Sequence, residues 1–387
     1  MAHSKIIEAF NLHRSVSTDT RKIKDGDVFF ALKGENFNGN RFASQAVDKG
    51  AAFVVIDEAE FLPENDARFI LVEDCLKALQ DLARHVREQF SIPVIGITGT
   101  NGKTTTKELL HAVLATEKKV HATAGNLNNH IGVPLTLLCM PEDTEVAIIE
   151  MGANKRGDIA ELCDIARPDH VLLTNIGYAH LERFGDIDGV QVTKGEMFDF
   201  VRDHGGRAYV NAADPRVLAA AKDLTNTAPF ASADSRFFIA GLNLMPERAH
   251  FDLMGLEGDV STPFDTALVG EHNVYNALAA VTIGSDLGIS IANMQAAIAA
   301  YTPKINRTQL IRTDDFLILL DAYNANPSSM AATLRGIAKQ DYGRVALILG
   351  DMFELGDKEA QLHTELVELV RDVLPEARLI GMGKAMM

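Results

Sequence analysis

The sequence contains little of what marks several classes of protein. Its 387 residues include three cysteines and no tryptophan, and its formal net charge is −16. The cysteines (Cys75, Cys139 and Cys163) lack the spacing of a metal site, which predicts reduced and mostly packed thiols. So strong a negative charge argues against a DNA or RNA partner, although a local cradle can still hold a nucleotide.

Long hydrophobic runs are also absent. The most apolar stretches, such as residues 316–320, are far too short to span a membrane. No apolar segment of the signal-peptide kind opens the chain, so we expect no leader sequence and a cytoplasmic protein. With 47% hydrophobic and 23% charged residues the composition is that of a globular protein, and the length predicts two or three domains.

The most informative segment present is Val-Ile-Gly-Ile-Thr-Gly-Thr-Asn-Gly-Lys-Thr-Thr-Thr, over residues 94–106. An apolar strand pattern breaks into glycines and is followed by Lys103, Thr104 and a helical pattern over 107–115. Backbone N–H groups at such a turn face an anion, the lysine neutralises phosphate charge, and the first threonine can hold Mg²⁺. The segment therefore predicts a nucleoside triphosphate site. The alternative is an ordinary strand–turn–helix, because Ile97 stands where the general phosphate-loop pattern has glycine.

Patterns along the chain predict an α/β protein of three units. Residues 1–90 are expected to form a small α/β unit. Residues 91–305 alternate strands with helices, which predicts a largely parallel sheet with helices on both faces, apart from an antiparallel excursion over 237–269. A linker at 302–304 precedes a third α/β unit, residues 306–387, with a small three-stranded sheet. We expect this unit to be incomplete, because the chain stops soon after its third predicted strand.

Hydrophobic periodicity sets the remaining elements. Strands are expected at residues 27–32, 52–56, 69–72, 146–150, 171–175, 208–211, 316–321, 344–349 and 378–380. Helices are expected at residues 75–90, 273–287, 291–300, 328–340 and 358–374.

Four single residues have positions that suit chemistry, and a fifth, Lys194, does not. Glu150 ends an apolar strand, where ligands of parallel sheets gather, so it is either a Mg²⁺ ligand or a helix cap. His180 follows the next strand on the same predicted rim. Asp321 ends a strand of the third unit and could accept from ribose hydroxyls, and Arg307 near the linker could reach a phosphate. Lys194, expected to open a helix, is by its pattern alone a surface lysine.

Asparagines cluster at two places. Asn126, Asn128 and Asn129 form a dense polar loop, which could serve a turn or bind a polar substrate. Asn273 and Asn276 lie three apart at the start of a predicted helix and share a face. They could cap that helix or contact the edge of a nucleobase.

Taken together, these motifs resemble those of the Mur ligase family. The family fingerprint is found in Gly99-Thr100-Asn101-Gly102-Lys103-Thr104-Thr105, which also accounts for the missing first glycine. It continues in Gly125-Asn126-Leu127-Asn128-Asn129, Glu150-Met151-Gly152-Ala153, Ala179-His180-Leu181-Glu182, Lys194-Gly195-Glu196, His272-Asn273 and Asp321-Ala322-Tyr323-Asn324-Ala325-Asn326-Pro327. The motifs cover nearly the whole chain in the family's order, and several occurring together are highly specific.

Fewer residues indicate a branch of the family. Residues 321–327 and Gly350-Asp351-Met352-Phe353-Glu354-Leu355-Gly356 are similar to the branch that adds D-alanyl-D-alanine to UDP-N-acetylmuramoyl-tripeptide. The Asn-Pro-Arg element typical of the branch that adds the third residue is missing. Ser17-Thr18-Asp19-Thr20-Arg21 resembles the uridine-nucleotide domain that both branches share. The family's last domain usually continues for several tens of residues, which again implies an incomplete third unit.

The resemblance implies the three-domain Mur ligase architecture. It comprises a UDP-substrate domain (1–90), a central P-loop-type ATP domain (91–305) and a Rossmann-like ligase domain (306–387). The implied activity is the last cytoplasmic step of peptidoglycan precursor synthesis, in which ATP activates UDP-N-acetylmuramoyl-tripeptide as an acyl phosphate for amide formation with D-Ala-D-Ala. A monomer without a nucleic-acid partner or membrane span is expected. The alternatives are the sister ligase that adds the third residue, the folate polyglutamate ligase, and a non-catalytic nucleotide-binding regulator.

The resemblance also implies roles for single residues. ATP would contact Gly99, Thr100, Asn101, Gly102, Lys103, Thr104 and Thr105, with Asn273 at the adenine, Asp321 at the ribose and Arg307 at a phosphate. Mg²⁺ would be held by Thr104, Glu150, His180 and Lys194, the lysine being carbamylated into a carboxylate-like ligand. Catalytic roles would fall to Lys103, Lys194, His180 and Arg307. Substrate contacts would come from Ser17, Thr18, Asn128, Asn129, Tyr323 and Asn326.

Overall fold

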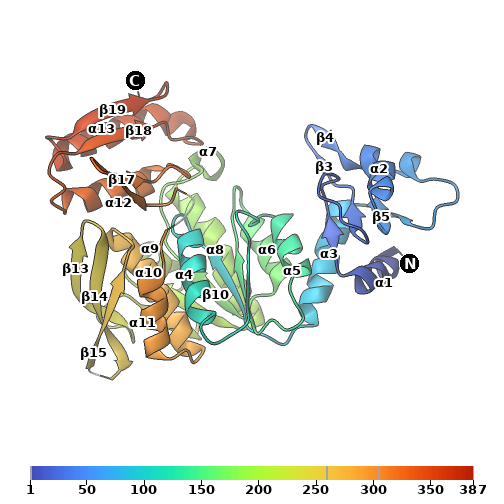
Figure 1. The fold of residues 1–387 in the computed structure, drawn as a ribbon, viewed down its shortest axis with the longest axis horizontal. Coiled ribbons are helices and arrows are strands. Elements are labelled where there is room, and N and C mark those ends of the chain that lie inside the picture. Colours follow the sequence, from blue (N-terminus) through green and yellow to red (C-terminus); the bar gives the residue numbers. More distant parts are fainter. Residues whose placement is uncertain (1, 259, 304–305, 387) are drawn as a thin grey trace. The chain divides into compact units, whose positions relative to one another are not determined.

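The computed structural model describes residues 2–258, 260–303 and 306–386, which form two compact units (Figure 1). Unit 1 comprises Met1–Val94, His121–Met151 and Glu161–Arg167, and unit 2 comprises Ile95–Val120, Gly152–Ala160 and Pro168–Met387. Lys304 and Ile305, at the predicted boundary between the central and third domains, lie outside the described residues.

Unit 1 contains a four-stranded parallel sheet. Its strands pair in the order β1 (Val16–Ser17), β2 (Val28–Phe30), β5 (Phe53–Ile56) and β6 (Phe69–Leu71). Strands of a parallel sheet are covered on both faces and are therefore continuously apolar. Accordingly, Val28, Phe29 and Phe30 are all buried. The strands predicted at 27–32, 52–56 and 69–72 are confirmed.

Helices and short elements complete unit 1. They are α1 (Ala2–His13), β3 (Lys33–Gly34), β4 (Phe37–Asn38), η1 (Gly39–Phe42), α2 (Ala43–Asp48), η2 (Ala59–Phe61), α3 (Cys75–Glu88), α5 (Gly132–Leu138) and β9 (Val146–Glu150). Elements β8 (Val120–Ala122) and α6 (Asp158–Ala166) have residues in both units, as does β7 (Val94–Thr98), whose first residue is in unit 1. Helix α3 begins where Asp74 accepts a hydrogen bond from the Lys77 N–H at 2.9 Å, as an N-cap residue does. The predicted helix at 75–90 is confirmed.

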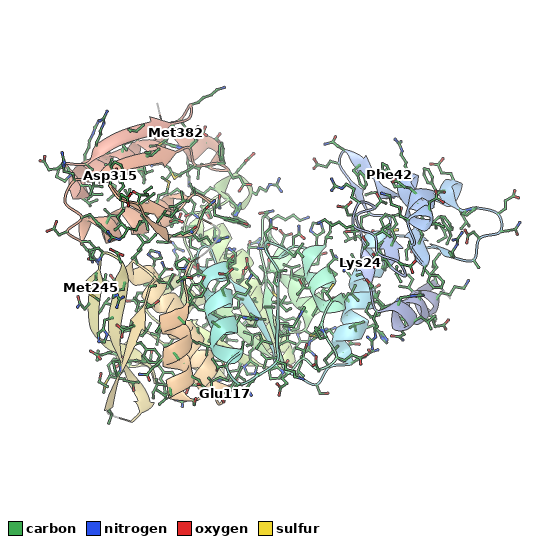
Figure 2. All side chains as sticks on the ribbon, in the orientation of Figure 1. Lys24, Phe42, Glu117, Met245, Asp315 and Met382 are labelled. Atoms are coloured by element: carbon green, nitrogen blue, oxygen red, sulfur yellow. The ribbon has the colours of Figure 1, made fainter. Side chains whose placement is uncertain are left out.

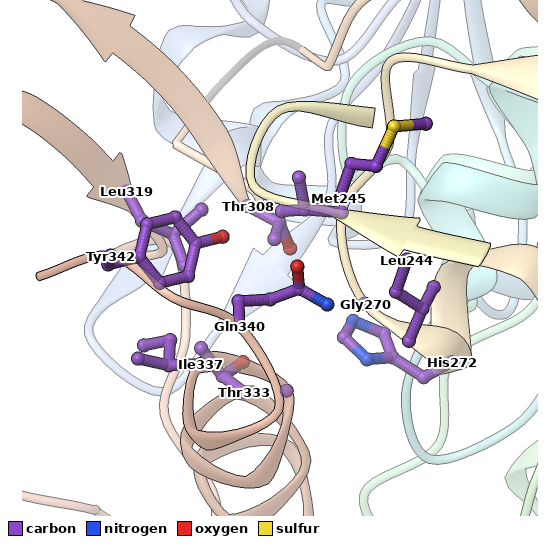
Figure 3. A pocket seen from close by; sticks show the side chains of 12 residues that line it. Leu244, Met245, Gly270, His272, Thr308, Leu319, Thr333, Ile337, Gln340 and Tyr342 are labelled. Atoms are coloured by element: carbon purple, nitrogen blue, oxygen red, sulfur yellow. The ribbon is translucent and has the colours of Figure 1, made fainter. Parts of the chain in front are cut away.

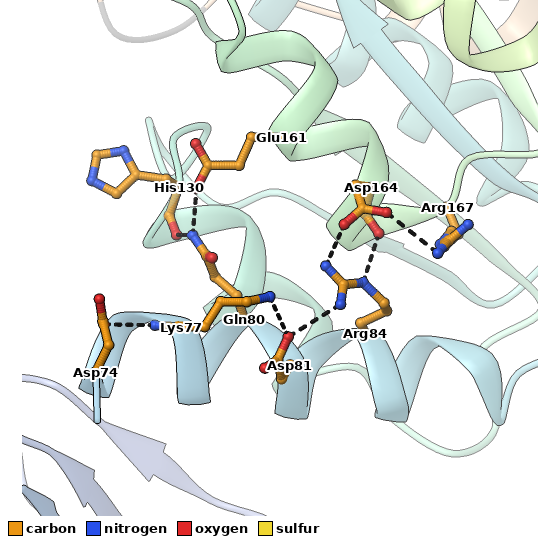
Figure 4. Close-up of polar contacts among 9 residues, drawn as sticks. All are labelled: Asp74, Lys77, Gln80, Asp81, Arg84, His130, Glu161, Asp164 and Arg167. Atoms are coloured by element: carbon orange, nitrogen blue, oxygen red, sulfur yellow. Dashed lines mark hydrogen bonds and ion pairs between the residues drawn. The ribbon is translucent and has the colours of Figure 1, made fainter. Parts of the chain in front are cut away.

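Polar side chains tie α3 to other parts of unit 1 (Figure 4). Gln80 donates from Nε2 to Glu161 Oε1 at 2.7 Å and to the His130 carbonyl at 3.2 Å. Arg84 bonds the Asp164 carboxylate and donates to the Asp164 carbonyl at 3.0 Å. These bonds join segments about eighty residues apart into one unit.

Unit 2 is built on four parallel strands in the order β12–β11–β10–β7. They are β7 (Val94–Thr98), β10 (His170–Leu173), β11 (Arg207–Asn211) and β12 (Thr227–Phe230). Because neighbouring strands run in the same direction, Thr98 pairs with Leu173 at one edge of the sheet. Ligands of such sheets bind outside the carboxyl ends of the strands. This edge therefore positions the segments that follow β7 and β10, and the predicted parallel sheet is confirmed.

Helices of unit 2 pack on this sheet or on one another, and side chains fill the space between them (Figure 2). They are α4 (Lys103–Leu114), α7 (Leu181–Phe184), α8 (Ile187–His204), α9 (Pro215–Ala220), α10 (Glu271–Asp286) and α11 (Ile291–Ala300). The expectation that Lys194 opens a helix is wrong, because α8 begins at Ile187. Its N-cap is Asp186, whose carboxylate accepts the Gly189 N–H at 2.8 Å.

The antiparallel excursion predicted over 237–269 is also confirmed. Its strands are β13 (Phe238–Met245), β14 (Arg248–Glu257) and β15 (Val260–Thr266), paired antiparallel in chain order. Stacked Phe251 and Phe264 rings, 5.3 Å apart at their centroids, are buried on one face.

The third predicted domain lies within unit 2, and its strands pair differently from the prediction. Its elements are β16 (Gln309–Arg312), β17 (Leu317–Leu320), α12 (Pro327–Ala338), β18 (Ala346–Gly350), η3 (Gly356–Lys358), α13 (Glu359–Val373) and β19 (Arg378–Met382). The expected single three-stranded sheet is wrong. Strand β17 pairs antiparallel with β16, β18 pairs parallel with β19, and these are two separate sheets among the described residues. The core joins Leu334, Met352 and Leu366 to Leu181 of α7.

Two further expectations concern the whole chain. None of the helices in the described part is long and apolar enough to be a membrane span. All three cysteines are free, and Cys75 and Cys163 are buried while Cys139 is exposed. The predicted reduced thiols are therefore confirmed.

Candidate active site

Two glycines shape the loop between β7 and α4. Gly99 has φ +145° and Gly102 has φ +79°, a backbone region that residues with side chains rarely adopt. A Cβ at Gly99 would overlap Thr174 Oγ1, and one at Gly102 would lie 2.5 Å from Asn276 Oδ1. Neither position can therefore carry a side chain without rearrangement.

The segment after β10 holds this loop in place. The Asn101 N–H donates to Asn175 Oδ1 at 3.0 Å, and the Asn101 carbonyl accepts from Thr174 Oγ1 at 2.6 Å and Asn175 Nδ2 at 2.9 Å. The Thr100 N–H donates to the Asn175 carbonyl at 2.9 Å. The backbone between the two glycines is thus fixed by the neighbouring strand end. Sequence reasoning assigned no role to Thr174 or Asn175, although they are the last two residues of a predicted strand.

Helix α4 starts directly from the loop. Its N-cap is Gly102, which has no side chain to satisfy the N–H groups of the first turn. Those N–H groups and the helix dipole favour an anion there. Lys103 donates from Nζ to the carbonyls of Gly99 at 2.8 Å and Thr100 at 3.1 Å, so its ammonium lies over the loop. Thr104 follows on the first turn and is buried. This arrangement can bind a phosphate group.

Two asparagines of α10 form a hydrogen-bonded network next to the loop. Asn273 is buried, donates from Nδ2 to the Val269 carbonyl at 2.9 Å, and accepts at Oδ1 from Asn276 Nδ2 at 3.0 Å. Asn276 Oδ1 in turn accepts from Thr106 Oγ1 of α4 at 3.2 Å. The structure thus places both asparagines in one hydrogen-bond network beside Gly102. Contact of Asn273 with adenine stays a prediction.

Lys194 is buried in the middle of α8, where its sequence pattern alone had indicated a surface residue. Burial lowers the pKa of its ammonium well below the usual range, and the positive charge of Lys103 lowers this pKa further. Asp158 and Glu196 act in the opposite direction. Glu196 is itself occupied by the N–H groups of Gly157 at 2.7 Å and Ala160 at 3.0 Å. The site therefore favours an uncharged Lys194 amine.

His180 joins the central part of unit 2 to the third domain. It precedes α7 with φ +51°, and its Nδ1 faces the carboxylate of Glu354, which follows β18 and has φ +61°. The Glu182 N–H donates to the Glu354 carbonyl at 3.1 Å. Burial lowers the pKa of His180, and Glu354 raises it. Glu354 was noted only as part of a motif, and its partner lies too far away in sequence to be found by pattern.

The remaining predicted residues of the third domain lie near β17. The Arg307 guanidinium lies 3.7 Å from the centroid of the Tyr323 ring, close enough for a cation–π interaction. Asp321 accepts at Oδ1 from the Thr308 N–H at 3.2 Å and at Oδ2 from Thr333 Oγ1 at 3.3 Å. These contacts hold Arg307 and Asp321, the two side chains of the third domain that the family resemblance assigned to ATP.

A pocket adjoins these residues (Figure 3). Leu244 and Met245 of β13 line it on one side, Ile337 and Tyr342 of the third domain line it on another, and His272 lies at the start of α10. Burial lowers the pKa of His272. The lining is mostly apolar and comes from β13, α10, β17 and α12 and from segments beside them.

Unit 1 contains the other predicted residues. Glu150 ends β9, is buried, and accepts at Oε1 from Asn128 Nδ2 at 2.8 Å. Its backbone N–H donates to Thr123 Oγ1 at 3.0 Å. Asn129 accepts the Gly132 N–H at 2.9 Å, as expected of a turn residue. The structure therefore brings Asn128 to Glu150, whereas Asn129 stabilises the loop.

Ser17 and Thr18 stand at the end of β1 in unit 1. Ser17 is buried and donates to the Asp19 carbonyl at 3.1 Å. Arg21 binds the Asp19 carboxylate and lowers its pKa to about 2. Contact of Ser17 and Thr18 with a substrate stays a prediction.

Metal ligation is likewise a prediction. No group of three or more His, Cys, Asp or Glu side chains in the described part of the chain is placed to hold a metal ion. The predicted ligands Thr104, His180 and Lys194 belong to unit 2, and Glu150 belongs to unit 1.

Three family models match the chain in succession. They are the Mur ligase family catalytic domain over residues 13–87, the Mur ligase middle domain over 97–284 and the Mur ligase glutamate ligase domain over 306–381.

Individual relatives agree with these models. The UDP-N-acetylmuramoyl-tripeptide–D-alanyl-D-alanine ligase of Bacillus subtilis is 39% identical over 90% of this chain and 76% of the relative. A crystal structure of MurF from Acinetobacter baumannii has a TM-score of 0.88 at 33% identity, covering 96% of this chain and 81% of that one. MurF ligase from Thermotoga maritima in complex with ADP has a TM-score of 0.86 at 29% identity, covering 95% and 84%. From the loop, the fold and these matches together, the chain belongs to the Mur ligase family.

Proposed function

We propose that this chain is an ATP-dependent ligase that joins D-alanyl-D-alanine to UDP-N-acetylmuramoyl-tripeptide. The observation that carries the proposal is the phosphate loop, with two obligatory glycines, the Lys103 ammonium and an uncapped helix start. The relative from Bacillus subtilis, named for this reaction, matches over most of its own length. The Thermotoga maritima neighbour is a complex with ADP.

Amide formation from a free carboxylate requires an activated acyl group. A carboxylate oxygen of the tripeptide attacks the γ-phosphorus of ATP, the bond to the β–γ bridging oxygen breaks, and ADP leaves. The amine of D-Ala-D-Ala then attacks the acyl carbon and loses a proton, and phosphate departs with its C–O bond broken. No protein nucleophile is needed, so the chain contributes positioning and charge neutralisation.

The loop residues suit the first of these steps. The first-turn N–H groups of α4 can hold phosphate oxygens, and Lys103 can neutralise the charge that develops between the β- and γ-phosphates. We assign Arg307, Asp321 and Asn273 to the same nucleotide, at a phosphate, the ribose and the adenine, as the family resemblance implies.

Mg²⁺ belongs to the same proposal. Thr104 supplies a buried hydroxyl on the first turn of α4, and hard cations prefer oxygen donors. When bound, Mg²⁺ would neutralise phosphate charge and polarise the γ-phosphoryl group. Glu150 and His180 stay predicted ligands of this kind.

Lys194 fits carbamylation on two grounds. Its lowered pKa favours the neutral amine, which is the form that can add to carbon dioxide. The resulting carbamate would be an anion beside Lys103, and it would offer oxygen ligands from a buried position. Lys194→Ala should lose activity, and short carboxylic acids should restore part of it. An unchanged rate without added acid would contradict this role.

Product identification tests the proposal. Incubation with ATP, Mg²⁺, UDP-N-acetylmuramoyl-tripeptide and D-Ala-D-Ala should yield the UDP-linked pentapeptide by mass spectrometry. Matched incubations with the UDP-linked dipeptide and a diamino acid, or with a folate and glutamate, test the two alternative ligases. A product only in one of those mixtures would overturn the assignment. We also expect a monomer that acts in the cytoplasm, where ATP and nucleotide-linked substrates are found.

A further inference from the structure

The side chains of Asn101 and Asn326 face each other within unit 2. Asn101 lies on the phosphate loop, and Asn326 is the N-cap of α12 in the third domain. Asn326 donates from Nδ2 to Asn101 Oδ1 at 2.7 Å, and Asn101 donates from Nδ2 to Asn326 Oδ1 at 3.4 Å. The two amides therefore exchange a reciprocal pair of hydrogen bonds.

The orientation of the Asn326 amide is fixed by a third bond. Its Oδ1 accepts the Ser329 N–H at 2.9 Å, within a capping box in which Ser329 Oγ also accepts the Asn326 N–H. A backbone N–H can only donate, so the atom that faces it must be the amide oxygen. Nδ2 is then the atom directed at Asn101. Asn326 is 6% exposed, so little of its amide remains for a ligand.

A second contact joins the same helix start to the loop. Ser328 Oγ accepts the Tyr178 N–H at 2.8 Å, and a Cβ added at Gly177 would lie 2.6 Å from it. Gly177 in turn donates from its N–H to Thr100 Oγ1 at 2.9 Å. The start of α12 thus reaches both Asn101 and, through Gly177, Thr100.

We propose that Asn326 is a positioning residue, which holds the phosphate loop through Asn101 so that nucleotide affinity depends on the third domain. The inference rests on the proposed function, because it needs a nucleotide at the loop. It replaces the expected substrate contact of Asn326. The backbone of Asn101 is tied to Thr174 and Asn175, and its side chain is tied to the third domain. Without the second tie, Asn101 is held only by the hydrogen bonds of its backbone to Thr174 and Asn175.

Calorimetric titration with ADP tests this role. Asn326→Ser keeps a side-chain oxygen that caps α12 but lacks the amide donor, and Asn324→Ala is a matched control at an exposed position of the same segment. Asn326→Ser should raise the Kd for ADP and the KM for ATP about 5- to 30-fold, since two modest hydrogen bonds are lost. Its KM for D-Ala-D-Ala and its melting temperature should stay close to those of the natural chain and of Asn324→Ala.

A double-mutant cycle separates the pair from its surroundings. Asn101→Ala should weaken ADP binding, and adding Asn326→Ser to it should cause little further loss, because the same contact is already broken. Additive effects would overturn the pairing. A normal ADP affinity in Asn326→Ser with a raised KM for D-Ala-D-Ala would overturn it in favour of substrate contact. A natural chain that binds no ADP would overturn the proposed function as well.

Discussion

Lys103 is the residue on which the proposed ATP site depends most directly. Its ammonium lies over the carbonyls of Gly99 and Thr100, at the start of a helix without a side-chain cap. Lys103→Ala should lower ATP turnover by more than about 100-fold, the usual cost of removing a preorganised charge partner. Lys222→Ala, at an exposed position of the same unit, is the control and should leave turnover unchanged. Full turnover in Lys103→Ala would contradict the phosphate-loop assignment.

Gly99 offers a test of the loop's shape. With φ +145° and Thr174 Oγ1 in the place of a Cβ, Gly99→Ala should destabilise the protein by more than about 1 kcal/mol. Gly336→Ala is the matched control, because Gly336 lies inside α12 and its added Cβ would have no neighbour nearer than 3.9 Å. That change should stabilise the protein by about 0.5–1 kcal/mol. Urea unfolding of both variants decides the matter, and equal stabilities would count against the loop conformation.

At the scale of single residues, the sequence predicted features that lie within one continuous segment of the chain. The loop motif lies in one continuous segment, so its glycines, Lys103 and Thr104 could be located from their order alone. Burial of Lys194 could not be predicted, because lysine side chains are mostly exposed and only the tertiary packing around α8 buries this one. The Asn101–Asn326 pair joins residues 225 apart, and no spacing rule relates them. The sequence placed both in motifs but gave Asn326 a substrate role.

Helix α7 is one of the elements that contact the third domain from the rest of unit 2. Its Leu181 is 3% exposed and belongs to the apolar cluster that contains Met352 and Leu355. Leu181→Ala should destabilise the protein by about 2–5 kcal/mol, the range for a large-to-small change in a core. Leu218→Ala in α9, where the side chain is 49% exposed, should cost less than about 1 kcal/mol. If both variants lost a similar free energy of unfolding in urea, the packing of α7 against the third domain would not stabilise the protein.

His121 of strand β8, partly buried beside helix α5, makes the stability of unit 1 depend on pH. His121 Nε2 lies 2.8 Å from the Thr136 carbonyl and therefore bears the proton that it donates. Burial lowers the pKa of His121 below its unfolded value of 6.5. Between these two pKa values the unfolded chain binds more protons, so stability rises with pH and is lost as the pH falls below about 6.5.

Melting temperatures measured from about pH 7 to about pH 5 test this contact. His170 and His272 also have lowered pKa values, so the natural chain should lose stability on acidification. His121→Gln keeps an N–H donor without a titratable ring, and its loss should be smaller. An identical fall in melting temperature in both proteins would show that His121 does not contribute to the pH dependence.

Element predictions succeeded where hydrophobic runs are continuous. Strands β2, β5, β7, β10 and β11 are buried along almost their whole length, so their apolar runs were visible. The sheet of the third domain was predicted wrongly, because β16 is only four residues long and was not recognised as the partner of β17. The start of α8 was also missed, although Asp186 is a good N-cap residue.

At the scale of the whole molecule, the ligase reaction requires three substrates to meet at one site. The sequence motifs and the three family models agree on the order of the domains along the chain. The domain boundaries after residues 90 and 305 stay predictions.

The central claim is that one active site couples ATP cleavage to amide formation with D-Ala-D-Ala. Phosphate release from ATP, measured with UDP-N-acetylmuramoyl-tripeptide and D-Ala-D-Ala and then with each substrate left out in turn, tests that claim most directly. The account predicts sustained release only when all three substrates are present. Release that continues unchanged without D-Ala-D-Ala, or ADP binding with no release in the complete mixture, would contradict it.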